Sequence, residues 1–171
     1  MEEILRMSPI QIGEMVKEWL EDDGYVIDDA GLMNTDFGWS FTTLNHQIYV
    51  LKVKNRRDSI IVTASFVLGK DKEKILQNPI TRELFYKLTM KYLELGLDYF
   101  FRPNFQSPDL IEICCPIHYD KLSKNQLAVN INIIRNAVIW TRKKIDKELY
   151  GSINADKLDS VNSPLTEGLP Y

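Results

Sequence analysis

The chain has 171 residues and a formal net charge of -3, and 44% of its residues are hydrophobic and 11% aromatic. This size and composition predict a single globular domain with its own core. The charge shows no basic excess of the kind that favours nucleic-acid binding. No apolar run approaches the ~20 residues that a membrane-spanning helix needs. The acidic start, Met1 to Ile4, lacks the hydrophobic core of a secretion signal, so we expect a cytoplasmic protein without a membrane partner.

The first predicted element is an amphipathic helix that begins after Ser8. Ser8 and Gln11 have the spacing of a capping box, and Pro9 suits the first helical position. Gly24 is placed to end this helix in a left-handed conformation. The apolar stripe of the helix consists of Ile12, Val16, Trp19 and Leu20.

Three strands are predicted after a polar connection over residues 28–36. In the first strand, Phe37, Trp39 and Phe41 share one face, because alternate residues of a strand point to the same side. A tight turn at Asn45-His46 leads to a second strand. The charged turn 54–58 leads to a third strand. These links are too short for parallel crossovers, so the sequence predicts an antiparallel meander.

The second half of the chain begins with a short helix predicted over 71–77. A longer helix starts at Asn78-Pro79 and stops at Gly96. Its inner stripe consists of Leu84, Leu88, Tyr92 and Leu95. Strands over 97–102 and 109–115 form a hairpin after it. Pro116 is expected to end the second of these strands or to place it at a sheet edge.

A long final helix is predicted from a second capping box, Ser123 and Gln126, to about Leu149. It carries two apolar stripes, so one stripe can cover a sheet while the other is free for a second partner. The first stripe is Leu127, Ile131, Ile134, Val138 and Ile145, and the second is Ile133, Ala137 and Trp140. We therefore divide the chain into one domain, 1–150, and a flexible tail, 151–171, where apolar density falls.

These elements predict an α+β protein built as a two-layer sandwich. Its five-stranded, mainly antiparallel sheet follows the order α-βββ-α-ββ-α and ends in the long C-terminal helix. From Ser8 to Tyr150 this order resembles the type III secretion chaperone fold, which is shared with YbjN-like proteins. It is also similar to an uncharacterised family of archaeal conserved proteins. The resemblance implies a small acidic homodimer that binds other polypeptides without catalysing a reaction. It transfers no individual binding residue, because such surfaces are defined by position and not by a motif.

Aromatic residues are the strongest candidates for a peptide-binding surface. Phe37, Trp39 and Phe41 form either part of the core under a helix or a partly open aromatic surface that receives a peptide. The same alternatives hold for Ile133 and Trp140 on the final helix. The leading hypothesis is a non-enzymatic, chaperone-like interaction module that works as a homodimer.

Two basic clusters support an alternative hypothesis from another class. The first contains Lys52, Lys54, Arg56 and Arg57, and the second contains Arg142, Lys143, Lys144 and Lys147. If the fold brings the clusters together, they form an anion-binding site for RNA backbone, although the recognised RNA-binding motifs are absent. Ordinary solubilising side chains are the simpler reading, so nucleic acid is an unfavoured partner.

The remaining chemistry of the sequence is sparse. Cys114 and Cys115 are adjacent in a strand, so their side chains diverge, and the nearest histidine is His118. Zinc sites need a second ligand pair with a different spacing. The sequence therefore predicts no metal site, no cofactor and no catalytic residue.

Overall fold

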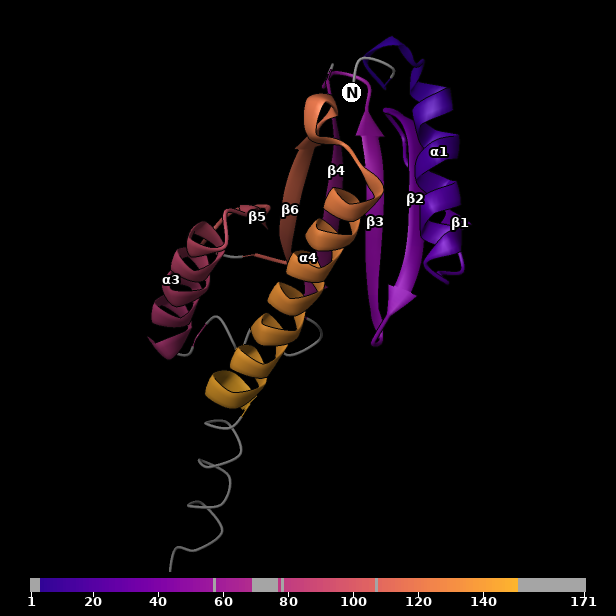
Figure 1. Cartoon of the computed structure of the whole chain (residues 1–171). Coiled ribbons are helices and arrows are strands. Elements are labelled where there is room, and N and C mark those ends of the chain that lie inside the picture. Colours follow the sequence, from indigo (N-terminus) through magenta and orange to yellow (C-terminus); the bar gives the residue numbers. More distant parts are fainter. Residues whose placement is uncertain (1–3, 57, 69–76, 78, 107, 151–171) are drawn as a thin grey trace, which may run out of the picture.

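The computed structural model of the protein describes residues 4–56, 58–68, 77, 79–106 and 108–150 (Figure 1). Its α-helices are α1 (Pro9–Asp22), α3 (Pro79–Glu94) and α4 (Lys124–Ile145). Its strands are β1 (Asp28–Asp29), β2 (Thr35–Thr43), β3 (His46–Val53), β4 (Ser59–Val67), β5 (Asp98–Arg102) and β6 (Leu110–His118). Short 3-10 turns cover Ile4–Arg6 and Tyr119–Lys121, and a π-helical turn, Asp146–Tyr150, extends α4.

The strands form one open antiparallel sheet of six strands in the order β1-β2-β3-β4-β6-β5. The prediction of five strands was wrong because β1 lies inside the expected polar connection 28–36. Its two residues pair with β2 through Asp28↔Ser40 and Asp29↔Trp39. Aspartate is disfavoured in strands and two residues have no periodicity, so this strand leaves no signal in the sequence. The predicted short helix over 71–77 lies almost wholly outside the described residues, as does the tail 151–171.

The helices lie over one face of the sheet, which confirms the α+β class. Strand register places Trp39, Val50 and Val62 side by side on this face. Helix α1 covers it near β2, α4 crosses β3, β4 and β6, and α3 lies beside β5 (Figure 1). The buried stripe of α4 is the one predicted from its spacing, from Leu127 to Ile145. Within the described ranges, no helix has both the length and the apolar composition to cross a bilayer.

The ends of α1 agree with the sequence. Ser8 N–H donates to Gln11 Oε1 at 2.8 Å, and Gln11 N–H donates to Ser8 Oγ at 3.3 Å, which completes the capping box. Gly24 follows the helix with φ +84°, the left-handed conformation that glycine adopts without strain. The second box is only half formed, because the Gln126 side chain donates to Asn130 Oδ1 at 2.8 Å instead.

Two turns differ in detail from their predictions. The β2–β3 hairpin turns at Leu44-Asn45, one residue before the expected pair, and both residues have positive φ. Strand β6 continues through Pro116 to His118 and does not end at the proline. The pairing of β6 with β5 stops at Asp98↔Cys114, so Pro116 lies beyond the end of β5. On that side Pro116 is at a local edge of the sheet, where no β5 residue needs the N–H group that proline lacks.

Candidate functional site

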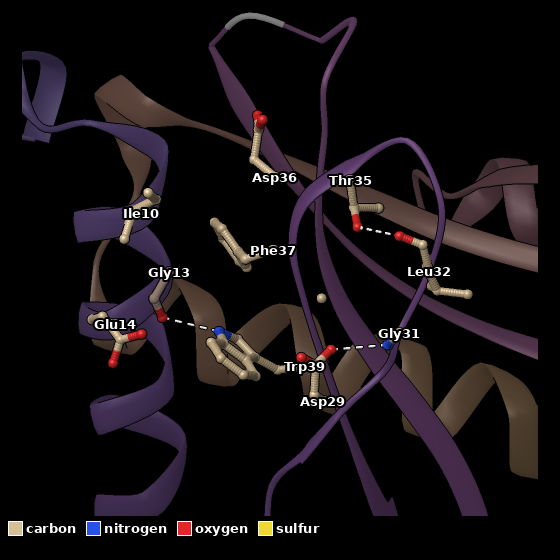
Figure 2. A pocket seen from close by; sticks show the side chains of 11 residues that line it. Ile10, Gly13, Glu14, Asp29, Gly31, Leu32, Thr35, Asp36, Phe37 and Trp39 are labelled. Atoms are coloured by element: carbon tan, nitrogen blue, oxygen red, sulfur yellow. Dashed lines mark hydrogen bonds between the residues drawn. The ribbon is translucent and has the colours of Figure 1, made fainter.

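A hollow of about 360 Å³ opens between α1 and the β1–β2 edge of the sheet (Figure 2). Helix α1, strands β1 and β2 and the connection between these strands supply its walls. The residues that line it are Ile10, Gly13, Glu14, Asp29, Gly31, Leu32, Thr35, Asp36, Phe37, Gly38 and Trp39. Its volume is near the lower end of the ~300–1,000 Å³ that small-ligand sites span. We call it the α1–β2 pocket.

The close approach of α1 to β2 at Gly13 shapes the pocket. A Cβ atom on Gly13 would lie 2.9 Å from the Phe37 ring, so only glycine lets the helix reach this strand without a shift. At this contact the Trp39 indole N–H donates to the Gly13 carbonyl at 2.9 Å, as Figure 2 shows. This bond orients the indole at the floor of the pocket.

The three aromatic residues of β2 have different environments. Phe37 and Trp39 line the pocket, with ring centroids 6.3 Å apart, and Trp39 is partly exposed. Phe41 is only 2% exposed and packs on Tyr25 at 4.3 Å between centroids. The structure therefore places Phe41 and most of Phe37, which is 9% exposed, in the core, and Trp39 is the one of the three that is partly exposed at the pocket.

Acidic side chains surround the aromatic floor. Glu14, Asp29 and Asp36 are exposed and line the pocket, and none of its lining residues is basic. Asp29 accepts a hydrogen bond from Gly31 N–H at 2.9 Å, which shapes the connection after β1. Lys17 lies outside the lining, with its Nζ 5.3 Å from the centroid of the Trp39 ring. The sequence could not reveal this combination, because its residues come from three separate segments.

The two peptide-binding candidates on α4 do not line the pocket. Ile133 and Trp140 are partly buried and pack against the core from the side of the helix. Lys144 Nζ lies 6.0 Å from the Trp140 ring centroid and covers part of it. The second stripe of α4 is therefore mostly an extension of the core packing, with Ala137 only 1% exposed.

The two basic clusters lie at opposite ends of the sheet. Lys54 and Arg56 are exposed in the β3–β4 turn, next to the first residue of β4, while Arg57 lies outside the described residues. Arg142 lies over Phe66, near the other end of β4, at 5.6 Å from the ring centroid. Seven residues of strand separate these ends by roughly 23 Å at ~3.3 Å per residue.

Lys143 is exposed beside Arg142, and Arg142 is engaged by Asp146 at 3.3 Å. The fold therefore does not unite the clusters into one anion-binding surface. The shared RNA-backbone site that the sequence suggested has no geometric support.

A buried lysine, Lys52, was grouped by sequence with the exposed cluster of the β3–β4 turn. Register pairs it with Phe37 on the helix-covered face, and its side chain is 2% exposed. Its ammonium donates to the carbonyls of Val53 and Arg56, and lies 5.8 Å from the Tyr119 ring centroid. Lys52 thus stabilises the turn from inside instead of offering a charge to a partner.

The adjacent cysteines point to opposite faces, as their strand position predicts. Cys114 faces the side of the sheet without helices and is 4% exposed. Cys115 faces α4, where Asn130 Nδ2 donates to its Sγ at 3.3 Å. Burial raises the pKa of the Cys114 thiol to about 11 and also raises that of Cys115, so neither thiol is an activated nucleophile. Among the described residues, no three histidine, cysteine or acidic side chains are arranged to hold a metal ion.

A second surface lies on α3, which is apolar on two sides. The inner stripe, Leu84, Leu88 and Tyr92, is completely buried. On the outer side Tyr86, Met90 and Leu93 follow at spacings of four and three residues and are 61%, 43% and 57% exposed. Strand β5, which packs beside α3, is the outermost strand of the sheet. We call these three residues the α3 stripe.

Known structures share this fold. An uncharacterised protein from Methanothermobacter thermautotrophicus superposes with a TM-score of 0.69 at 19% identity, covering 78% of this chain and 96% of the other. A chain of the ExsC–ExsE complex gives 0.53 at 14% identity, covering 78% and 93%. YbjN from E. coli gives 0.50 at 10% identity, covering 81% and 92%.

The resemblance to the secretion-chaperone and YbjN-like fold is therefore confirmed. Comparison with curated protein sequences gives no significant match. A family model matches residues 12–145, from within α1 to the end of α4, and so includes the α3 stripe and every lining residue of the pocket except Ile10. The chain belongs to the family described as uncharacterised conserved protein DUF2299.

Proposed function

We propose that this protein is a non-enzymatic interaction module that binds a segment of another polypeptide and works as a homodimer. The observation that carries the proposal is the α1–β2 pocket, where the Trp39 ring, oriented by its bond to Gly13, is partly exposed near the edge of the sheet. The similarity to a chain of the ExsC–ExsE complex, a complex of two proteins, supports it. Exposed aromatic surface next to a fixed backbone is typical of protein-recognition sites.

The sheet edge beside the pocket supports binding of an extended segment. Strand β1 covers only the part of β2 that runs from Trp39 to Ser40, together with the Ala30 N–H bond to the Gly38 carbonyl at 2.9 Å. Strand β2 is nine residues long, so part of its outer edge has no strand partner among the described residues. Extended peptides add to such edges while their side chains enter adjacent pockets.

Binding of an unfolded polypeptide tests this function. The probe is fluorescein-labelled ribonuclease that has been reduced and carboxamidomethylated, and its anisotropy is measured as the protein is added. We expect saturable binding that Ile10→Lys weakens by about tenfold, because Ile10 lies at the pocket mouth and is 71% exposed, so the change does not disturb the core.

The matched control is Val129→Lys, a substitution at an exposed apolar residue of α4 outside the pocket. This control should bind the probe like the unchanged protein. If the probe does not bind at all, or if both lysine variants weaken it equally, the proposed function is wrong.

The α3 stripe is the surface that we propose for the dimer. Its three large side chains are exposed at one helix face, next to the free edge of β5, and a second copy would bury them around a two-fold axis. In a monomer these side chains would remain in water at a cost of ~25 cal/mol per Å² of apolar area.

Light scattering tests this dimer. We expect the unchanged chain to have the mass of two copies, and Met90→Glu combined with Leu93→Glu to have the mass of one, because two desolvated carboxylates would oppose the interface. Val26→Glu combined with Met33→Glu is the control, since these residues are 84% and 91% exposed and lie away from α3. A monomer over a wide concentration range, before any substitution, would contradict the homodimer.

A further inference from the structure

The chemistry of the α1–β2 pocket goes beyond general peptide binding. We propose that the pocket takes an arginine side chain of the bound polypeptide, which lies on the Trp39 ring and pairs with Glu14, while Asp36 adds negative charge on the strand side. This inference rests on the proposed polypeptide binding and names the residue that the segment must carry. Figure 2 shows Glu14 on the helix wall beside the Trp39 ring, and Asp36 on the strand side, beyond Phe37 and directed away from Trp39.

Several carboxylates elsewhere on the described surface are paired with basic residues, whereas Glu14 and Asp36 are not. Asp22 and Asp23 at the end of α1 are both paired with Lys124, at 3.0 and 3.3 Å. Further acidic residues are paired within the chain, among them Glu83, Glu94, Glu112, Asp146 and Glu148. No described basic residue forms an ion pair with Glu14 or Asp36. The pocket therefore presents negative charge that the described part of the chain does not neutralise.

The aromatic floor selects an organic cation. The Trp39 ring already contacts an ammonium in this protein, since Lys17 Nζ lies 5.3 Å from its centroid, so a bound arginine would replace Lys17 there or share the ring with it. The indole N–H is occupied by the Gly13 carbonyl, so the ring offers its π system and its apolar edge to a ligand, not a hydrogen-bond donor. The described histidine, cysteine and acidic residues provide no three-ligand group for a metal ion.

The size and shape of the pocket favour arginine. About 360 Å³ accommodates a long side chain with the adjoining backbone but not a folded domain. A guanidinium group is planar, stacks on aromatic rings and carries five N–H donors, so it can contact a ring and a carboxylate at once. A lysine ammonium is more strongly hydrated and does not stack, so it should bind more weakly.

A pair of peptides that differ in one charge tests the proposal. The probe is a fluorescein-labelled hexapeptide of glycine, leucine and serine with one central arginine, and its partner carries citrulline, which has the same shape without the charge. We expect the arginine peptide to bind at least about tenfold more tightly, in line with charge-assisted hydrogen bonds. The preference should fall as salt is raised.

Matched variants locate the effect. Glu14→Gln combined with Asp36→Asn should bring the two peptides to within about twofold of each other, whereas Glu18→Gln combined with Asp120→Asn, which removes two exposed charges outside the pocket, should leave the preference intact. All four residues are exposed, so both variants are expected to fold.

The outcomes separate the two proposals. If the unfolded ribonuclease binds but the arginine and citrulline peptides bind equally, the arginine pocket is wrong and the polypeptide-binding function stands. If the preference survives in the Glu14→Gln, Asp36→Asn variant, the cation binds elsewhere and the pocket assignment is wrong. If neither the ribonuclease nor the peptides bind, both proposals are wrong.

Discussion

Replacing Phe41 by alanine should lower the free energy of unfolding by about 3–5 kcal/mol, the usual cost of deleting a buried aromatic ring. Phe41 is 2% exposed, and its ring packs on Tyr25 with 4.3 Å between the centroids. Its backbone pairs with Ile48 of β3, and its side chain points to the helix-covered face of the sheet. The structure has little freedom to close the resulting cavity, because α1, β2 and β3 all border it. Urea denaturation followed by circular dichroism measures the change.

The matched control is Phe100→Ala on β5. Phe100 is also a strand phenylalanine, but it is 42% exposed and lies on the side of the sheet without helices. We expect its loss to cost under ~1 kcal/mol. A similar cost for both substitutions would mean that Phe41 is not part of the core. In that case its role as a peptide-binding residue, which the sequence allowed, would again be open.

The aromatic residues of β2 show how far sequence reasoning reaches. Alternation placed Phe37, Trp39 and Phe41 on one face, and the structure confirms that face. The alternation of side chains along a strand does not predict how closely a helix approaches each residue. That distance is decided at Gly13, where the missing side chain lets α1 contact Phe37 and leaves the pocket beside Trp39. The floor of the pocket was therefore predictable, but the pocket was not.

The register of the strands explains why the sequence misplaced some of the charged residues. Lys52 and Lys54 are two residues apart in a basic segment, and by composition both belong at the surface. The buried side chain of Lys52 follows from its pairing with Phe37, past a shift in register between Thr35 and Phe37 that no local pattern reveals. The separation of Arg56 from Arg142 likewise depends on the direction in which α4 crosses the sheet. Local patterns predicted the elements well, and the long-range pairings decided which charges meet.

The inner face of α3 leads to a prediction about alkaline pH. Tyr92 is fully buried, and its hydroxyl lies 2.6 Å from Thr141 Oγ1 on α4. Thr141 donates its own proton to the Ala137 carbonyl at 2.8 Å, so Tyr92 is the donor in the bond between the two helices. Burial raises the pKa of Tyr92 to about 12, whereas an unfolded tyrosine has a pKa of about 10.

This difference in pKa makes stability depend on pH with a definite sign. Below pH ~10 the tyrosine is neutral in both states, and its contribution to stability is complete. Between about pH 10 and 12 the unfolded chain ionises while folded Tyr92 does not, so stability falls, by up to ~2.7 kcal/mol for two pKa units at 1.36 kcal/mol each. Burial also raises the pKa of Tyr119 to about 12, so part of the alkaline loss belongs to that residue.

Comparing Tyr92→Phe with the unchanged protein isolates the contribution of Tyr92. Near pH 7 the variant should be less stable by ~1 kcal/mol, because it lacks the hydrogen bond to Thr141. From pH 10 to 12 its stability should fall less steeply, so the two curves should approach each other and cross. Tyr86→Phe on the exposed side of α3 should follow its parent protein at every pH, provided that both carry Met90→Glu and Leu93→Glu, which keep Tyr86 out of the proposed dimer interface. Parallel curves for Tyr92→Phe and the unchanged protein would show that Tyr92 ionises equally in both states, and that α3 does not pack on α4 as the structure has it.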